Sequence, residues 1–396
     1  MLVYNEEELR NDLDANFGRP YQQCSLSVMD TIADPNISFD KNGVCNYYYE
    51  YKKAEDQFVI KGEAGLKKLE ESIAKIKAAG KDKKYDCILG LSGGVDSTYL
   101  CLLAKQYGLR PLVIHCDNGW NSELAVNNIE NTVNKLGFDL FTYVINWEDF
   151  KEMQLAYLKA SVVDIEVLTD HAFMTVLYEQ ARKWNIKYIF AGTNIVTEQV
   201  LPKHWIYYKG DVENIKDIFK KFGRIPLNNI KTYPFMNYYT RLYCNNVLNL
   251  EVVTPLNFIH YDYSEVKEII KKELGWRDYG GKHYESVWTR FYQGYILPAK
   301  FHIDKRKAHL SNLIYSGQLS KKDAVAQLKL PMYNEELLNQ DMDFVQRKFN
   351  LSIKEFNEIM SLPRREHSEF AKQKSLEERY PFAKQIINLV KNKMVK

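Results

Sequence analysis

The 396-residue sequence contains no run of about 18 consecutive apolar residues, the length that a helix needs to cross a bilayer. Its first residues, Met-Leu-Val-Tyr followed by Asn-Glu-Glu-Glu, also lack the basic and apolar regions of a secretory signal peptide. We therefore expect a cytoplasmic protein that has no membrane partner.

A charge excess is missing as well, because 54 Lys and Arg stand against 51 Asp and Glu, a net charge of +3. This near balance disfavours a nucleic-acid partner, although a local basic patch would suffice for one. Only six cysteines are present, at positions 24, 45, 87, 101, 116 and 244. Their wide spacing does not form the dense framework of a disulfide-stabilised fold.

Two common phosphate-binding patterns are absent from the main glycine turn, which has neither Gly-Lys-Ser/Thr nor Gly-x-Gly-x-x-Gly. Instead, the apolar run 86–91 leads into Ser-Gly-Gly-Val-Asp-Ser, and apolar residues then recur at helical spacing. The pattern indicates a strand, a loop and a helix. Adjacent glycines let the backbone turn tightly and present N–H groups, and a helix N-terminus attracts anions, which together predict polyphosphate binding. The serines add hydroxyl donors, and the aspartate is a ligand for nucleotide-bound Mg²⁺. The predicted polyphosphate-binding residues here are Ser92, Gly93, Gly94, Asp96 and Ser97.

Strand and helix patterns alternate after this loop. Alternation of this kind predicts an α/β fold with a doubly wound parallel sheet, whose ligands bind at the carboxyl ends of the strands. A strand-like run at 250–256 and a helix at 264–274, capped by Ser264, follow, and the chain from 308 onward reads as amphipathic helices. The predicted strands are 112–115, 140–144 and 188–191, and the predicted helices are 122–136, 148–159, 171–184, 321–328, 341–349 and 353–360.

Polar residues stand where the predicted strands end. Asp117 is a candidate for nucleotide or substrate contact, with an Asx turn before Asn-Gly as the equal alternative. Glu198, one helical turn beyond a strand end, is a second candidate for Mg²⁺. Asp170 and His171 are candidate substrate residues, and Asp170 fits the cap of a helix equally well. Nucleotide contact is further expected from Gly192, Thr193 and Asn194.

The densest group of reactive side chains lies between residues 282 and 309, with glycines, aromatics and both signs of charge mixed. This mixture suits a polar pocket better than a solvated helix face. Lys282 and Arg290 are candidates for neutralising the charge on departing pyrophosphate. His283 and Glu285 are candidates for proton transfer, and a structural role for His283 is nearly as good an interpretation. The candidate substrate residues of this region are Tyr292, Gln293, Lys305 and Arg306.

The N-terminal module, about residues 24–48, contains the turn pair Asn42-Gly43 between short extended runs. A structural zinc site needs four ligands, and only Cys24 and Cys45 are present, with Ser27 and Tyr48 at the partner positions. We therefore expect no zinc.

A glutaminase signature is missing too. Position 2 is Leu, and no cysteine occupies a Gly-x-Cys-x-Gly elbow with a matching His-x-Glu. Ammonia, if the chain uses it, must then be free or come from a separate subunit.

The loop at 92–97 resembles that of the ATP-pyrophosphatase (PP-loop) superfamily, whose adenine-nucleotide alpha-hydrolase-like fold and ATP chemistry the resemblance implies. Most of the chain resembles the N-acetyl sugar amidotransferases of surface-polysaccharide biosynthesis, the pseudaminic-acid and lipopolysaccharide acetamidino-forming type. That family usually has two cysteine pairs near its N-terminus, and this chain keeps one cysteine of each. The stretches that carry the resemblance are 28–31, 40–46, 92–97, 169–172, 192–194, 281–286, 289–293, 300–301 and 304–306.

The resemblance implies that the acetamido oxygen of an N-acetyl sugar or nucleotide-sugar attacks ATP, and that ammonia then displaces AMP to give an acetamidino group. It further implies a glutaminase subunit and a cyclase-like subunit as partners. Two other functions stay open: an RNA-modifying thiolase, for which Cys116 is the best placed cysteine, and a nucleotide-binding subunit without catalysis. We expect an N-terminal module at 1–60, an ATP-pyrophosphatase domain at 61–210, a substrate-binding region at 211–310 and a helical C-terminal region at 311–396.

Overall fold

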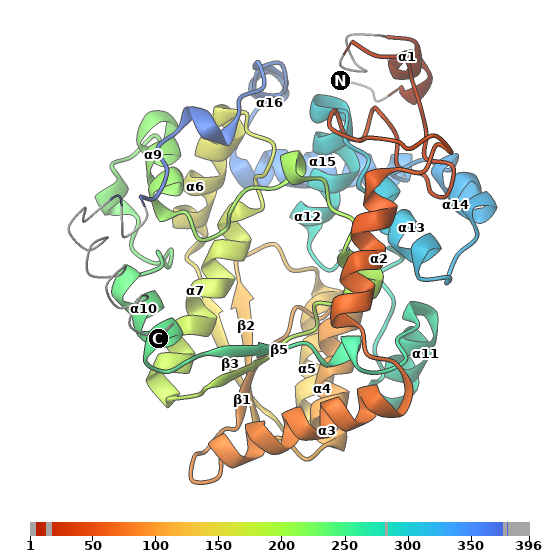
Figure 1. Cartoon of the computed structure of the whole chain (residues 1–396). Helices are drawn as coiled ribbons and strands as arrows, with labels where there is room; N and C mark the ends of the chain where they lie inside the picture. The colour runs from red at the N-terminus through yellow and green to blue at the C-terminus, as the bar shows by residue number, and fades with distance from the viewer. Residues whose placement is uncertain (1–4, 13–17, 282–283, 375–377, 379–396) are drawn as a thin grey trace.

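The computed structural model describes residues 5–12, 18–281, 284–374 and 378. Its centre is a five-stranded sheet in the order β3-β2-β1-β4-β5, with all neighbouring strands parallel (Figure 1). The order reverses between β1 and β4, which is the switch point at which doubly wound sheets bind ligands. The predicted α/β class and doubly wound parallel sheet are therefore confirmed. The strands are Cys87–Gly90 (β1), Pro111–Asp117 (β2), Asp139–Val144 (β3), Tyr188–Phe190 (β4) and Glu251–Val253 (β5).

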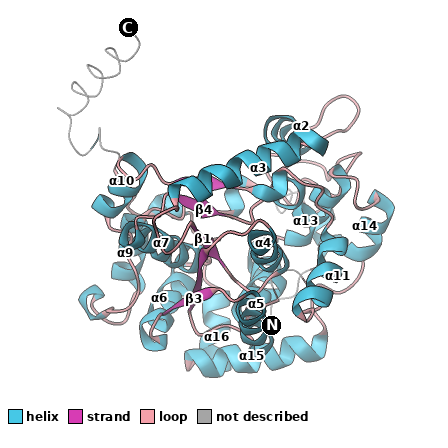
Figure 2. Cartoon of the chain, turned by 90° about the horizontal axis from the view of Figure 1, so that it is seen from below, coloured by secondary structure: helices cyan, strands magenta, loops and turns pink. Residues whose placement is uncertain are grey.

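Helices cover both faces of the sheet because residues along β1 and β2 alternate between them. Leu89 and Val113 pack on one side with four helices, and Ile88 and Leu112 pack on the other with one long helix. Figure 2 shows the sheet between α4 and α5 on one side and α7 on the other. The first group is Gly62–Ala79 (α3), Val95–Gln106 (α4), Glu123–Leu136 (α5) and Tyr263–Leu274 (α11), and the opposite helix is Val167–Trp184 (α7).

A larger apolar core lies beyond the sheet and gathers segments far apart in the sequence. Trp120, after β2, stacks on Trp288 with ring centroids 5.4 Å apart, and Phe349 packs edge-on against Trp288 at 5.3 Å. Figure 1 shows this region above the sheet, where α12, α13 and α15 gather. Its elements include Trp147–Ala160 (α6), Val212–Phe222 (α9), Val287–Phe291 (α12), the π-helix Tyr292–Phe301 (η4), Lys305–Tyr315 (α13), Glu335–Phe349 (α15) and Ile353–Met360 (α16). The expected helical C-terminal region is thereby confirmed for the described residues.

Several predicted boundaries need correction. The cap of α11 is Asp262, whose carboxylate accepts from the N–H groups of Ser264 and Glu265, so Ser264 is not the cap. Helix α7 starts at Val167, which places Asp170 inside its first turn and rules out the cap alternative. The fifth strand has only three residues, and α15 begins six residues before the predicted 341. The remaining elements are Glu6–Asn11 (α1), Asn46–Phe58 (α2), Ile195–Glu198 (α8), Tyr238–Asn246 (α10), Lys321–Leu328 (α14), and the short turns Lys203–Trp205, Leu227–Asn229, Pro255–Asn257 and His367–Glu369 (η1, η2, η3, η5).

No helix in the described ranges is both long and apolar enough to span a bilayer. The domain boundaries at 60, 210 and 310 remain predictions. The sheet itself continues past residue 210, because β5 pairs with β4.

Candidate active site at the switch point of the sheet

The loop between β1 and α4 is a tight turn held by its own serines. Gly93 has φ +86°, a conformation that glycine adopts without strain, and Gly94 is the N-cap of α4. The Ser92 hydroxyl accepts from the N–H of Gly94 at 3.2 Å and lies 3.1 Å from the Ser97 hydroxyl. The structure thus places four of the predicted polyphosphate-binding residues, Ser92, Gly94, Asp96 and Ser97, around one cavity of about 220 Å³.

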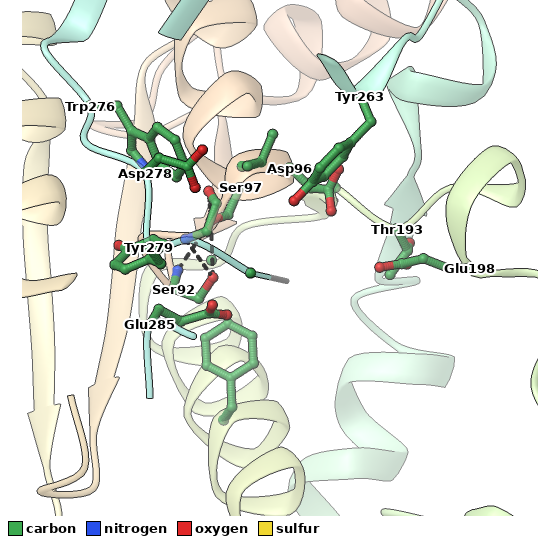
Figure 3. Close-up of a pocket in the computed structure, with 16 residues that line it drawn as sticks. Ser92, Asp96, Ser97, Thr193, Glu198, Tyr263, Trp276, Asp278, Tyr279 and Glu285 are labelled. Carbon is green, nitrogen blue, oxygen red and sulfur yellow. Dashed lines mark hydrogen bonds between the residues drawn. The ribbon is translucent and has the colours of Figure 1, made fainter. Parts of the chain in front are cut away.

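The opposite wall of this cavity comes from segments that the sequence did not single out as nucleotide ligands. The indole N–H of Trp276 and the hydroxyl of Tyr279 both donate to the Gly93 carbonyl, at 2.8 and 2.9 Å. Phe173 of α7 fills the space beside Gly90, where an added Cβ would lie 2.2 Å from its ring. The only sequence signal for this wall was the aromatic, glycine-rich stretch 275–286. Figure 3 shows Trp276, Asp278 and Tyr279 on one side of the serines, with Glu285 facing Ser92.

The two candidate Mg²⁺ ligands lie in the same cavity. Asp96 and Glu198 both line it, and both act on the phenol of Tyr261, whose pKa is raised by burial and by these carboxylates. Figure 3 shows Thr193 and Glu198 beyond Asp96 and Tyr263. The described residues hold no group of three or more His, Cys, Asp or Glu around one point. Two carboxylates nevertheless fit Mg²⁺, since this ion usually binds one or two protein carboxylates together with substrate phosphates.

Glu285 lies at the edge of the loop. An added Cβ on Gly94 would be 3.4 Å from its Oε1 atom, and its carbonyl accepts from the N–H of Ser122 at 3.0 Å. This hydrogen bond and the bridge between Asn121 and Ser286 attach the start of the C-terminal region to the segment that follows β2. Two further predicted catalytic residues, Lys282 and His283, lie outside the described residues.

Arg290 is held by protein and is not among the described residues that line the loop cavity. Its guanidinium forms a bidentate ion pair with Asp341, at 2.7 and 2.8 Å, and its Nε atom also lies 3.3 Å from the Tyr333 hydroxyl. With both side chains largely buried, the pair neutralises itself. The predicted role of Arg290 at pyrophosphate is therefore not supported by its position.

Three predicted substrate residues are also structural. His171 is fully buried, its Nδ1 lies 2.6 Å from the Lys209 carbonyl, and its Nε2 accepts from the Met236 N–H at 3.0 Å. Tyr292 is buried and donates to the carbonyl of Val163. Arg306 pairs with the Asp304 carboxylate at 2.8 Å and with backbone carbonyls of the α14 region. These interactions give His171, Tyr292 and Arg306 structural roles, and their contact with substrate stays a prediction.

Other predicted residues take local roles beside the cavity. Asp117 forms the Asx turn, its carboxylate accepting from the N–H of Gly119 at 2.8 Å. Asn194 caps α8 through the N–H of Thr197 at 2.9 Å, while Gly192 and Thr193 line the cavity. Gln293 is half-buried at the start of η4.

A second group of charges, which we call the Glu166 cluster, stands at the start of α7. Glu166 Oε2 accepts from the Thr289 hydroxyl at 3.1 Å, whereas Oε1 is buried without a partner among the described residues. Burial, helped by the charge of Asp170, raises the pKa of Glu166 to about 7. The Lys209 ammonium pairs with Asp164 at 2.6 Å and with Asp170 at 3.1 Å. The cluster consists of Asp164, Glu166, Asp170, Lys209 and Lys305.

The two cysteines of the N-terminal module meet at a tyrosine. The Tyr315 hydroxyl lies 3.3 Å from Cys45 Sγ and 3.9 Å from Cys24 Sγ, and it donates to Ser27 Oγ at 2.7 Å. A hydroxyl group thus joins two thiols and a serine in the interior of the module.

Three comparisons with known proteins give matches. Residues 285–386 match the family described as "LPS biosynthesis protein WbpG-like, C-terminal domain". A GMP synthase [glutamine-hydrolyzing] of Thermosipho africanus is 29% identical over 258 residues, 56% of this chain and 46% of that protein. The uncharacterized protein MJ1599 of Methanocaldococcus jannaschii is 29% identical over 131 residues, 33% of this chain and 45% of that protein. The chain therefore spans less than half the length of these two relatives.

Among solved structures, the chain is similar to an NH3-dependent NAD synthetase from Campylobacter jejuni, with a TM-score of 0.31, 14% identity, and coverage of 72% of this chain and 95% of that one. The loop, the parallel sheet and the sequence matches, taken together, make this chain similar to the amidotransferase-like proteins of the PP-loop ATP-pyrophosphatase superfamily.

Proposed function

We propose that the protein is an ATP-dependent amidotransferase that converts the acetamido group of an N-acetyl sugar or nucleotide-sugar into an acetamidino group, releasing AMP and pyrophosphate. One observation gives the proposal its strongest support. The stretch that matches the WbpG-like domain begins at Glu285, and Glu285 is itself part of the wall of the loop cavity. The stretch that matches a domain described for lipopolysaccharide biosynthesis thus contributes its first residue to the proposed nucleotide site.

The reaction divides between the two sides of the cavity. The loop N–H groups and the hydroxyls of Ser92 and Ser97 would hold the phosphates of ATP. Asp96 and Glu198 would bind Mg²⁺, which offsets the negative charge of pyrophosphate. The acetamido oxygen would then attack the α-phosphorus, and ammonia would displace AMP from the resulting imidate.

Ammonia is proposed to come from a separate glutaminase subunit, with a cyclase-like subunit as a second partner, because the sequence holds no recognisable glutaminase motif. Free ammonium would replace glutamine in a test with the isolated chain.

The experiment incubates the protein with ATP, Mg²⁺, ammonium and a panel of UDP- and CMP-linked N-acetyl sugars. We expect equal amounts of AMP and pyrophosphate, dependent on one sugar, and a product about one mass unit lighter because NH replaces oxygen. Formation of ADP alone, or AMP release without a change in the sugar, would refute the proposal. Asp96→Asn is the matched variant that should stop the reaction while the protein remains folded.

An RNA thiolase is the second candidate, and the setting of Cys116 weakens it. This half-buried thiol lies on β2, and burial raises its pKa to about 12, so little reactive thiolate exists at neutral pH. Replacement of Cys116 by Ser is expected to leave AMP formation intact under the amidotransferase proposal and to abolish activity under the thiolase alternative.

A further inference from the structure

Glu166 is the N-cap of α7, the helix that supplies Phe173 to the loop cavity, and does not itself line that cavity. Positions 166, 170 and 173 share one face of α7, since they are four and three residues apart, and Phe173 on that face lines the cavity. The Asn118 amide, following β2, donates to the Thr169 hydroxyl at 3.2 Å and ties this turn to the carboxyl edge of the sheet. The carboxyl group therefore stands about two helical turns, roughly 10 Å, farther from the loop than Phe173.

A second connection reaches Glu166 from the opposite wall. Glu285 faces the loop, and Thr289, four residues later on α12, donates its hydroxyl to Glu166 Oε2 at 3.1 Å. The same hydrogen bond leaves Oε1 as a buried acceptor with no partner in the described part of the chain. A buried carboxylate oxygen without a hydrogen-bond donor destabilises the protein. A ligand N–H that donates to this oxygen would therefore gain more binding free energy than one that donates to a solvated oxygen.

The substrate supplies a donor on that side. A secondary amide is planar and trans, so its N–H points away from its carbonyl oxygen. When the acetamido oxygen faces ATP at the loop, the N–H points away from the loop, on the side toward the end of α7 that carries Glu166.

We propose that Glu166 is a second catalytic carboxyl group, which takes the amide proton of the substrate during attack on ATP and returns it when ammonia displaces AMP. The inference rests on the proposed function.

The proton balance of the two steps is closed. In the first, the amide oxygen forms a bond to the α-phosphorus, the bond from this phosphorus to pyrophosphate breaks, and the N–H proton moves to Glu166 as the C=N bond forms. In the second, ammonia forms a bond to the imidate carbon, the C–O bond breaks with departure of AMP, and Glu166 returns its proton to the nitrogen. The product is an amidinium cation, and the one proton left from ammonia goes to pyrophosphate or solvent.

The surroundings suit a group that both takes and gives a proton at neutral pH. Burial raises the Glu166 pKa to about 7, and a base of this pKa is half ionised where cytoplasmic enzymes work. Thr289 is the hydrogen-bond donor of the group. The charged or titratable side chains that act on it are Asp164, Asp170, Lys209, Lys305 and Tyr292.

The test measures the first step alone, as pyrophosphate–ATP exchange with the sugar nucleotide that supports AMP release, in the absence of ammonium. Glu166→Gln keeps the shape and cannot take a proton, so we expect a loss of about 100-fold or more in exchange with the ATP KM within about twofold. Wild-type exchange should decline below an apparent pKa near 7, and this decline should be absent from the residual rate of the variant. Glu179→Gln, the same change farther along α7 at a half-buried glutamate whose pKa burial also raises, is the matched control.

Thr289→Val adds a milder variant that should fold normally. Loss of the hydroxyl donor destabilises the Glu166 carboxylate and raises its pKa, so the decline of the exchange rate at low pH (the acid limb of the pH–rate profile) should move to higher pH. Exchange within about threefold of wild type in Glu166→Gln, or an unchanged acid limb in that variant, would overturn the inference while leaving the amidotransferase reaction in place. If no sugar in the panel supports AMP release by the wild type, the proposed function fails, and the role of Glu166 fails with it.

Discussion

The Tyr261 hydroxyl donates a hydrogen bond to Oδ1 of Asp96, the first carboxylate of α4. Tyr261 is buried, and its pKa is raised well above the ordinary value, so the phenol remains a donor at all physiological pH values. One oxygen of Asp96 is therefore oriented by protein. Asp96 also lines the cavity.

Removal of this hydrogen bond is expected to weaken binding of Mg·ATP. Tyr261→Phe should raise the KM for Mg·ATP by about tenfold, in keeping with about 1.5–3 kcal/mol for a hydrogen bond to a charged group. Calorimetric titration of Mg·ATP measures the effect directly. Tyr99→Phe is the control, because its ring lies 6.3 Å from that of Tyr261 and it has no hydrogen bond to Asp96. Equal affinities in wild type and Tyr261→Phe would contradict this role.

A methyl group on Gly93 should damage the loop more than the fold. Alanine at φ +86° costs about 1–2 kcal/mol, and its Cβ would lie 3.0 Å from the Tyr279 hydroxyl that holds the loop carbonyl. We expect at least a tenfold loss of ATP affinity. Gly137→Ala, at φ +67° in the cap of α5 with no atom within 4 Å of the new Cβ, should cost similar stability without changing affinity. The prediction is wrong if the two variants bind ATP equally well.

Arg290 is expected to stabilise the protein through Asp341. Arg290→Met leaves the buried Asp341 carboxylate without its cation, with only the Tyr333 hydroxyl still donating to it, which costs about 3–5 kcal/mol in the free energy of unfolding. The double variant Arg290→Met with Asp341→Leu should recover most of this loss in denaturant titrations. At temperatures where the single variant is folded, its KM for ATP should equal that of wild type. A tenfold higher KM in the folded variant would restore the role at pyrophosphate that its sequence position suggests.

Buried histidines should make the protein less stable in acid. Burial lowers the pKa of His171 to about 4 and that of His367 to about 3, against 6.5 for an unperturbed histidine. The unfolded chain then binds more protons below pH 6.5, so stability present above this pH is lost as the pH falls, by up to about 1.4 kcal/mol per unit for each group. Thermal unfolding between pH 7 and 5 should show the decline. His171→Gln should flatten it, the exposed His260→Gln should not, and a constant melting temperature would refute the assignment.

Tyr315 is expected to hold the N-terminal module without metal. Tyr315→Phe removes the hydroxyl shared by Ser27 and the two thiols and should cost about 1–3 kcal/mol of stability. Tyr48→Phe, a neighbouring ring 5.4 Å away, is the control. EDTA should leave the melting temperature of the wild type unchanged. A drop on chelation would mean that a metal ion contributes to this module.

The sheet and its loop were predictable because their information is local. Apolar runs of four to seven residues and one glycine turn determine β1, β2 and the start of α4, whatever follows them. The far wall was not predictable, because Phe173, Tyr261 and Trp276 reach the loop from roughly 80 to 190 positions away, and spacing holds no record of such contacts.

The roles of charged residues are even harder to predict from the sequence, because they depend on partners far away in the chain. Arg290 stands in a cluster that suits a phosphate site, yet its partner Asp341 lies 51 positions later. A sequence pattern does not tell whether a cation is neutralised by protein or by ligand. Glu166 is the converse case, because only the buried, unpartnered oxygen in the structure draws attention to it.

The hydrogen bond from Ser122 to Glu285 bears on how such proteins diversify. The WbpG-like segment begins at the residue that faces the phosphate loop, and the Trp120–Trp288 stack joins the two parts behind it. An exchange of residues 285–386 between relatives would replace Glu285 at the edge of the loop and leave the strand that enters the loop, together with Trp276 and Tyr279, untouched. The same junction constrains such an exchange, because the incoming segment must carry an aromatic ring that packs against Trp120. Recombination is therefore expected to succeed between relatives whose segments keep the rings that pack against Trp120, which here are those of Trp288, Phe344 and Phe349.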